Sequence, residues 1–177
     1  VLYRSSSNTL RNNNMISNSY SFGVYGVSLS DYINDVDASN MVNGKPVYYW
    51  VNQFDKQVPT NAGYVAIVNS TRVAVKDLNL SKNEHGVLFA YTTNSIITNI
   101  TASDNYYGIY LRSSDGNMIG GNSLANNYWD GIGLYYSYTN TITQNVVTDN
   151  YDDIYLWRSD NNTISGNNIA KSWQDGI

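Results

Sequence analysis

The chain of 177 residues contains no cysteine, two prolines and a single histidine. The lack of cysteine excludes disulfide bonds and thiolate metal sites. Charged residues make up 14% of the chain, against about 25% in typical soluble domains. No apolar run in the sequence approaches the roughly 18 residues that a membrane-spanning helix needs. The net charge of −4 disfavours nucleic acid and anionic membranes as partners, because both bind a basic face.

Helical periodicity is also missing. No segment carries apolar residues at a sustained spacing of 3.6, whereas β-branched residues and Gly/Asn turns dominate. The pattern therefore predicts an all-β protein.

What the sequence does contain is an internal repeat with a period of about 22 residues. The segment 108–130 reads GIYLRSSDGNMIGGNSLANNYWD, and related copies begin at Gly131 and Asp153. Each copy opens on an anchor residue followed by alternating apolar and other residues, which is typical of a strand. The anchors are Gly26, Gly63, Gly86, Gly108, Gly131, Asp153 and Gly176. Short strands repeated at this period predict a right-handed parallel β-helix, or solenoid, with three-strand coils forming a single domain over residues 1–177.

Asparagines recur at two turns of each copy. We expect them to stack into amide ladders that satisfy buried backbone groups, a structural role that their turn chemistry favours over ligand binding. The first ladder comprises Asn34, Asn94, Asn117, Asn140 and Asn162, and the second Asn99, Asn122, Asn145 and Asn167.

One interval breaks the rhythm, because Gly26 and Gly63 are separated by more than one coil. The excess lies within residues 42–62, which hold both prolines, a tight-turn signal at Asn43-Gly44 and a strand-like run at 47–51. We expect a hairpin-like insertion or flap that leaves the solenoid wall. This insertion either determines the specificity of ligand binding or merely covers the apolar wall of the solenoid.

The two ends of the chain match each other. Read from tail to head, Gly176 and Ile177 followed by Val1 and Leu2 give GI-VLYRSSSNTL, which aligns with GIYLRSSDGNMI from Gly108. Neither end carries a recognisable cap, and the uncapped edges of a β-helix favour pairing. The sequence therefore predicts head-to-tail assembly of copies through these ends. The chain also opens without Met and in mid-pattern, which favours a mature or excised segment of something larger.

The segments GIYL (108–111), NMI (117–119) and GKPVYYWVNQ (44–53) resemble the NosD-type repeats, also called carbohydrate-binding and sugar-hydrolysis (CASH) domains, which occur in surface proteins of methanogenic archaea. The resemblance spans nearly the whole chain. It implies a right-handed parallel β-helix located outside the cytoplasm, at the cell surface, in association with polysaccharide or the cell envelope. It carries over no catalytic motif, because the repeats define a scaffold.

The sequence does not support copper binding, the role for which NosD is named. A copper site needs imidazole, thiolate or clustered thioether ligands, whereas His85 is the only histidine and Met15, Met41 and Met118 look like wall or turn positions. We expect no metal and no cofactor. The acidic turns lack any recognised calcium-loop spacing.

The outward positions of the first strand form a candidate carbohydrate-binding face. Aromatic rings offer flat apolar surfaces to sugars, and Arg can bind the carboxylates of acidic sugars. The residues are Tyr110, Tyr135, Tyr155, Trp157, Arg112 and Arg158, and a second aromatic column holds Tyr106, Tyr128, Tyr151 and Trp173. The alternative is that stacked rings only stabilise neighbouring coils.

Acidic residues also recur at one turn, as Asp130, Asp152 with Asp153, and Asp175. Carboxylates one coil apart could act as an acid and base pair, and the weak catalytic candidates are Asp130 and Asp153. Asp before Gly is, however, an ordinary turn residue. Any enzyme built on this pair would be a polysaccharide lyase or glycoside hydrolase, but the pattern favours a non-catalytic module.

Four glycosylation sequons lie at Asn69, Asn79, Asn99 and Asn161. We expect modification at Asn69, Asn79 and Asn161 in a secretory context, and not at Asn99, which the repeat assigns to the inward ladder.

Two hypotheses follow from the sequence. The first is an extracellular structural β-solenoid of a cell-surface layer or sheath that assembles head to tail. The second is a β-helix domain that binds or cleaves polysaccharide.

Overall fold

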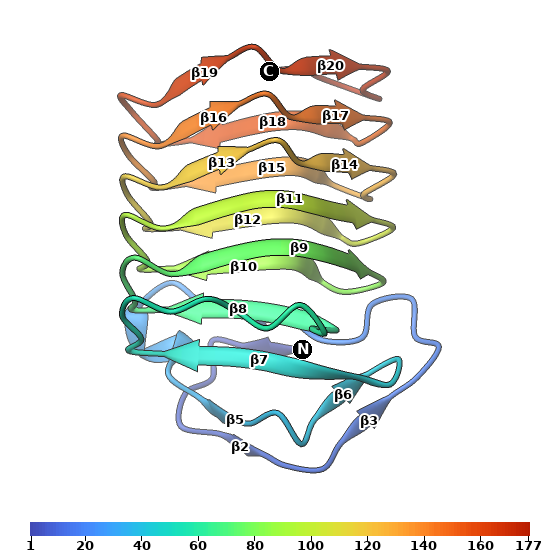
Figure 1. Ribbon diagram of the computed structural model, residues 1–177, viewed down its shortest axis with the longest axis vertical. Helices are drawn as coiled ribbons and strands as arrows, with labels where there is room; N and C mark the ends of the chain where they lie inside the picture. The colour runs from blue at the N-terminus through green and yellow to red at the C-terminus, as the bar shows by residue number, and fades with distance from the viewer.

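Parallel strands stacked coil on coil form the protein, as the repeat predicts (Figure 1). The computed structural model describes all residues 1–177. One face of the solenoid consists of β7 (Lys45–Val51), β8 (Tyr64–Val68), β10 (His85–Ala90), β12 (Tyr107–Arg112), β15 (Asp130–Tyr135) and β18 (Asp152–Trp157), all paired in parallel. The all-β solenoid prediction is confirmed.

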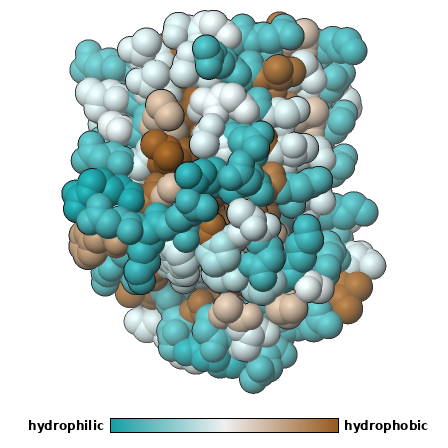
Figure 2. Space-filling model, in the orientation of Figure 1, coloured by the Kyte–Doolittle hydropathy of each residue, from teal (hydrophilic) through white to brown (hydrophobic).

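The remaining strands of each coil form a second sheet. In the lower coils each is one long strand, β9 (Ala74–Ser81) and β11 (Ile96–Ser103). Above them the strand divides into two, namely β13 (Met118–Gly120) and β14 (Ser123–Ala125), β16 (Thr141–Thr143) and β17 (Val146–Thr148), and β19 (Thr163–Ser165) and β20 (Asn168–Ala170). The face seen in Figure 2 is mainly polar, with small apolar patches.

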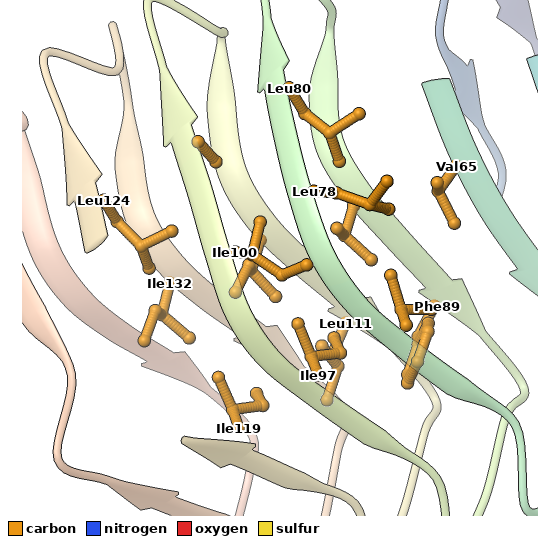
Figure 3. Packing of buried hydrophobic residues seen from close by; sticks show 14 of the residues in the cluster. Val65, Leu78, Leu80, Phe89, Ile97, Ile100, Leu111, Ile119, Leu124 and Ile132 are labelled. Atoms are coloured by element: carbon orange, nitrogen blue, oxygen red, sulfur yellow. The ribbon is translucent and has the colours of Figure 1, made fainter. Parts of the chain in front are cut away.

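The interior is filled by columns of aliphatic side chains (Figure 3). Val87, Ile109 and Ile132 occupy matched positions on successive strands of the first sheet and are fully buried. Ile97 and Ile119 face them from the second sheet. The interior cluster contains 22 buried residues, and its burial removes the apolar positions of every coil from water.

The asparagine ladders are present and bind backbone groups, as predicted. Asn117 donates from its backbone N and its Nδ2 to Oδ1 of Asn140, at 2.8 and 3.1 Å, and the same Nδ2 donates to the carbonyl of Thr92 at 2.9 Å. Asn122 makes the equivalent bonds to Asn145. A third ladder, Asn105, Asn127 and Asn150, was not singled out in the sequence.

Two ladder assignments were wrong by one residue. Asn94 is exposed with φ of 49°, and Ser95 takes the place beside Asn117. Asn99 is also exposed and donates to Asp77 at 2.7 Å instead of facing inward. In both cases the turn requires a left-handed residue, for which Asn is well suited, next to the inward position.

The segment 42–62 forms a hairpin turn as expected, but it does not leave the wall. Asn43 and Gly44, with φ of 48° and 79°, connect β6 (Met41–Val42) to β7 in an antiparallel pair. β7 then pairs in parallel with β8 and so belongs to the first sheet. The flap prediction was therefore wrong for this strand, because its apolar residues continue the wall. Val65 pairs with Val87, so Tyr64 and not Gly63 takes the anchor position.

The N-terminal segment, residues 1–42, folds differently from the expected coils. Three parallel pairs form here, β1 (Leu2–Tyr3) with β4 (Val24–Tyr25), β2 (Thr9–Leu10) with β5 (Asp35–Val36), and β3 (Asn14–Met15) with β6. Gly26 anchors no strand, because the chain continues into a short 3₁₀ turn, η1 (Leu29–Tyr32). No helix in the structure is long and apolar enough to span a membrane.

This N-terminal segment covers the outer face of the lower coils. Its Phe22 packs edge-on against Tyr64 with ring centroids 5.0 Å apart. A second cluster of 13 buried residues joins it to Ala66, Leu88 and Tyr110 on the outside of the first sheet. The outer face therefore has a covered lower part and an open upper part.

Candidate functional site

The open upper part of the first sheet carries the predicted aromatic face. Tyr110, Gly133 and Tyr155 share one outward column. Tyr135 lies in the next column, and its ring leans over Gly133, where an added Cβ would come within 2.9 Å of Tyr135 Cε2. The Tyr135 ring thereby fills the gap, 4.9 Å from the ring of Tyr110 and 5.7 Å from that of Tyr155.

Only part of this aromatic run is accessible. Tyr110 is 7% exposed, because Tyr25 of the N-terminal segment packs against it with ring centroids 6.1 Å apart. Trp157, at the other end, is 47% exposed. A ligand can therefore reach the upper coils, whereas Tyr110 serves to support the rings above it.

A cleft of about 490 Å³ opens at this place. It is lined by Arg112, Trp129, Tyr135, Tyr151, Asp152, Tyr155, Trp157 and Gln174, and this cleft is called the upper cleft below. Four of the six predicted carbohydrate-binding residues meet here, namely Arg112, Tyr135, Tyr155 and Trp157. Trp129 and Tyr151, which stack face to face at 4.7 Å, form a second aromatic wall. The repeat had placed Tyr151 in a separate column, and it gave no sign that Trp129 faces the same cleft.

The two arginines are held by a residue that sequence reasoning missed. The guanidinium carbons of Arg112 and Arg158 lie 4.4 and 5.7 Å from the ring centroid of Tyr136. Arg112 Nε is buried without a hydrogen-bond partner. Arg158 is exposed and does not line the upper cleft. The cation–π contact fixes the direction of the Arg112 side chain.

Asp130 lies fully buried behind the upper cleft. Its Oδ2 accepts a hydrogen bond from the Tyr135 hydroxyl at 2.9 Å, and its Oδ1 has no partner. Burial raises the pKa of Asp130 to about 7, the Tyr135 hydrogen bond acts in the opposite direction, and the Asp152 charge raises it further. Asp130 pairs in register with Asp152, which does line the cleft.

Asp153, the other catalytic candidate from the sequence, faces elsewhere. It accepts hydrogen bonds from Asn150 Nδ2 at 2.8 Å and from Ser172 Oγ at 2.7 Å, at the end of the third asparagine ladder. Burial raises its pKa. The structure therefore pairs Asp130 with Asp152 and gives Asp153 a place in the interior hydrogen-bond network.

Comparison with known families identifies the scaffold. The model of the family described as periplasmic copper-binding protein (NosD) matches residues 38–177, which is most of the chain. The chain belongs to the NosD family. No curated protein and no solved structure matches it. The resemblance found in the repeats is thus confirmed, and the family description is of a periplasmic protein.

The residues of this NosD-family chain do not fit the copper of the family name. His85 is fully buried between Tyr25 and Tyr107, with ring centroids 4.7 and 5.6 Å away, and neither ring nitrogen has a hydrogen-bond partner. Met15 pairs with Val42 and Met41 with Asn14, so the two methionines project from opposite faces of their strands. Nowhere do three His, Cys, Asp or Glu side chains converge.

The remaining predicted positions lie outside the upper cleft. The sequon residues Asn69, Asn79 and Asn161 are all exposed, as is Asn99. Gly176 continues the first sheet above β18, since its carbonyl accepts from the Ile154 amide at 3.1 Å. Val1 and Leu2 lie at the flank of the lower coils, where β1 pairs with β4, and the two termini are at different heights of the stack (Figure 1).

Proposed function

We propose that this NosD-family domain binds polysaccharide outside the cytoplasm through the upper cleft. The observation that carries the proposal is the convergence of Tyr135, Tyr155, Trp157 and the stacked pair Trp129 and Tyr151 on one open cleft. Aromatic side chains that only stabilise coils would be covered, as Tyr110 is. An open cleft with aromatic walls and a few polar groups is typical of a ligand site.

The polar groups of the cleft suit sugar hydroxyls. Arg112, Asp152 and Gln174 stand among the rings, and together they offer both donors and acceptors. Asp130 is fully buried behind Tyr135, so it has no direct access to a glycosidic bond. The geometry therefore favours binding over cleavage.

Affinity electrophoresis tests the proposal. The protein is run through gels containing hydroxyethyl cellulose, glycol chitosan or polygalacturonate. We expect at least one polysaccharide to retard it, and we expect Trp157→Ala to weaken that retardation about tenfold. Phe54→Ala is the matched control, because Phe54 is 58% exposed and lies outside the cleft. The proposal is wrong if no polysaccharide retards the protein, or if Trp157→Ala and Tyr155→Ala migrate like the parent.

Head-to-tail assembly into a surface layer is a second proposal. It is supported by the free edges of β19 and β20, each of which pairs on one side only, and by the half-buried Ile164 and Ile169 beside them. Val1 to Leu10 could complete the coil that starts at Gly176 only by leaving β4 and β5. Electron microscopy and sedimentation at high concentration test it. Filaments that Ile164→Lys abolishes are expected, and a monomer at every concentration contradicts it.

A further inference from the structure

A second cleft lies directly beside the upper one. It has a volume of about 580 Å³ and is lined by Ser19, Tyr20, Lys82, Asp104, Asn105, Asn126, Asn127, Tyr128, Asp149, Tyr151 and Trp173, and this cleft is called the side cleft. Tyr151 lines both clefts. The N-terminal segment contributes Tyr20, whose ring packs edge-on against Tyr106 at 5.6 Å. The side cleft is therefore formed between this segment and the turns that follow β9, β11, β14, β17 and β20.

Aromatic rings run without interruption from one cleft to the other. Tyr106 lies 5.2 Å from Tyr128 and stacks on Trp129 at 6.4 Å, and Trp129 stacks on Tyr151. Tyr128 and Trp173 are 62% and 80% exposed. A ring as open to water as that of Tyr128 gains little from burial within the coil stack, so packing alone does not account for its place in this column.

The charges along both clefts are mainly acidic. Asp104 and Asp149 line the side cleft together with Lys82, and Asp152 lines the upper cleft together with Arg112. Lys82, Asp104 and Asp149 stand at the same turn of three coils and have left-handed backbones, with φ of 58°, 56° and 60°, and Asn126 occupies this turn in the coil between Asp104 and Asp149. The excess of one carboxylate over the two cations favours a neutral or cationic chain over a polyanion.

We infer that the upper and side clefts are consecutive subsites of one binding track that crosses Tyr151, and that the track takes an uncharged or amino-sugar polysaccharide. The inference rests on the proposed function of the upper cleft. A chain held by both clefts gains affinity over a chain held by one, because the second contact is intramolecular once the first has formed.

Calorimetry with oligosaccharides of two lengths tests the track. Cello- and chito-oligosaccharides of two and six sugars are titrated into the full chain. We expect the six-sugar ligands to bind at least tenfold more tightly than the two-sugar ligands. Trp173→Ala and Tyr128→Ala should remove this gain and leave the two-sugar affinity unchanged, whereas Trp157→Ala should weaken both ligands.

The outcomes separate the two proposals. If Trp157→Ala weakens binding but Trp173→Ala and Tyr128→Ala do not alter the six-sugar affinity, the track is wrong and the proposed function stands. If Trp157→Ala changes nothing, the proposed function fails as well. Tighter binding of galacturonate oligomers than of chito-oligomers would contradict the ligand class. Phe54→Ala again serves as the control for an exposed aromatic residue outside both clefts.

Discussion

The Tyr135 hydroxyl donates a hydrogen bond to Asp130 Oδ2 at 2.9 Å, and this contact connects the wall of the upper cleft to a buried carboxylate. It is possible because residue 133 is glycine. A Cβ there would lie 2.5 Å from Asp130 Oδ2 and 2.9 Å from the Tyr135 ring. The position of the ring in the cleft therefore depends on the absence of a side chain at Gly133.

Gly133→Ala is expected to displace Tyr135 and to weaken polysaccharide binding about tenfold. The Tyr135 ring can rotate away, so the loss of stability should stay near about 1–2 kcal/mol. Affinity electrophoresis measures binding, and urea unfolding measures stability. Gly120→Ala, in β13 and away from the cleft, should bind like the parent. A Gly133→Ala protein that binds normally would show that the Tyr135 position is irrelevant.

Asp130 should make the protein less stable as the pH rises. Its folded pKa of about 7 lies above the ordinary value of 3.8, so between these pH values the folded state keeps a proton that the unfolded state has lost. Stability is then lost by roughly 1.4 kcal/mol per pH unit. Because His85 contributes an opposite pH dependence below about pH 6.5, the parent should have nearly level stability between about pH 4 and 6.5, and Asp130→Asn should instead become more stable as the pH rises through this range. Urea unfolding at pH 4 to 8 detects the difference. An unchanged slope would contradict the raised pKa.

His85 should act in the opposite direction. Burial lowers its pKa from 6.5 to about 3, so its contribution to stability is present above pH 6.5 and is lost as the pH falls toward 3. His85→Phe keeps a ring between Tyr25 and Tyr107. The free energy of unfolding of this variant should be larger at pH 4 than at pH 7, because only the contribution of Asp130 then remains. Between about pH 4 and 6.5 the two groups offset each other in the parent. Asp130→Asn and His85→Phe should therefore each show a pH-dependent free energy of unfolding in this range, with opposite signs. The variant that carries both substitutions should not.

Asn140→Ala should cost about 3 kcal/mol in the free energy of unfolding, because alanine leaves buried polar groups without partners. The Asn140 Oδ1 accepts from the backbone N and Nδ2 of Asn117, and its Nδ2 donates to the carbonyl of Ser114 at 3.0 Å. Asn168→Ala is the matched control, because Asn168 is exposed in β20, and it should change stability by less than about 0.5 kcal/mol. Equal losses of stability in the two variants would contradict a structural role for the asparagine ladder.

The ladder assignments show where sequence reasoning reached its limit. At Asn117 and Asn140 the repeat gave the correct register, because each residue is followed by one outward and one inward residue. At Asn94 the same spacing failed, since the adjacent Ser95 takes the inward position and its Oγ accepts from the Val73 amide at 2.9 Å. A slip of one residue exchanges inward and outward positions in a strand, and the apolar pair Ile96 and Ile97 does not indicate which one is buried.

The candidate site was predicted in part. Tyr135, Tyr155 and Trp157 follow from the alternation along the first strand, which fixes the face on which each side chain lies. Trp129 and Tyr151 could not be found in this way, because they stand at the turn before the strand, and their approach to the face depends on the curvature of the coil.

The sequence by itself determined the coil. A short, regular period with apolar alternation and turn asparagines leaves parallel stacking as the way to bury every apolar position, since each coil pairs with the coils above and below. Only the tertiary structure decided what happens to the outer face. The N-terminal segment carries the same strand signals, yet it folds over β8, β10 and β12. Its Phe22, Val24 and Tyr32 join the outward side chains of these strands in one buried cluster, which removes apolar surface of that face from water. Contacts between segments so far apart in the chain produce no periodic pattern in the sequence. They determine where the N-terminal segment ends on the outer face and where the upper cleft begins.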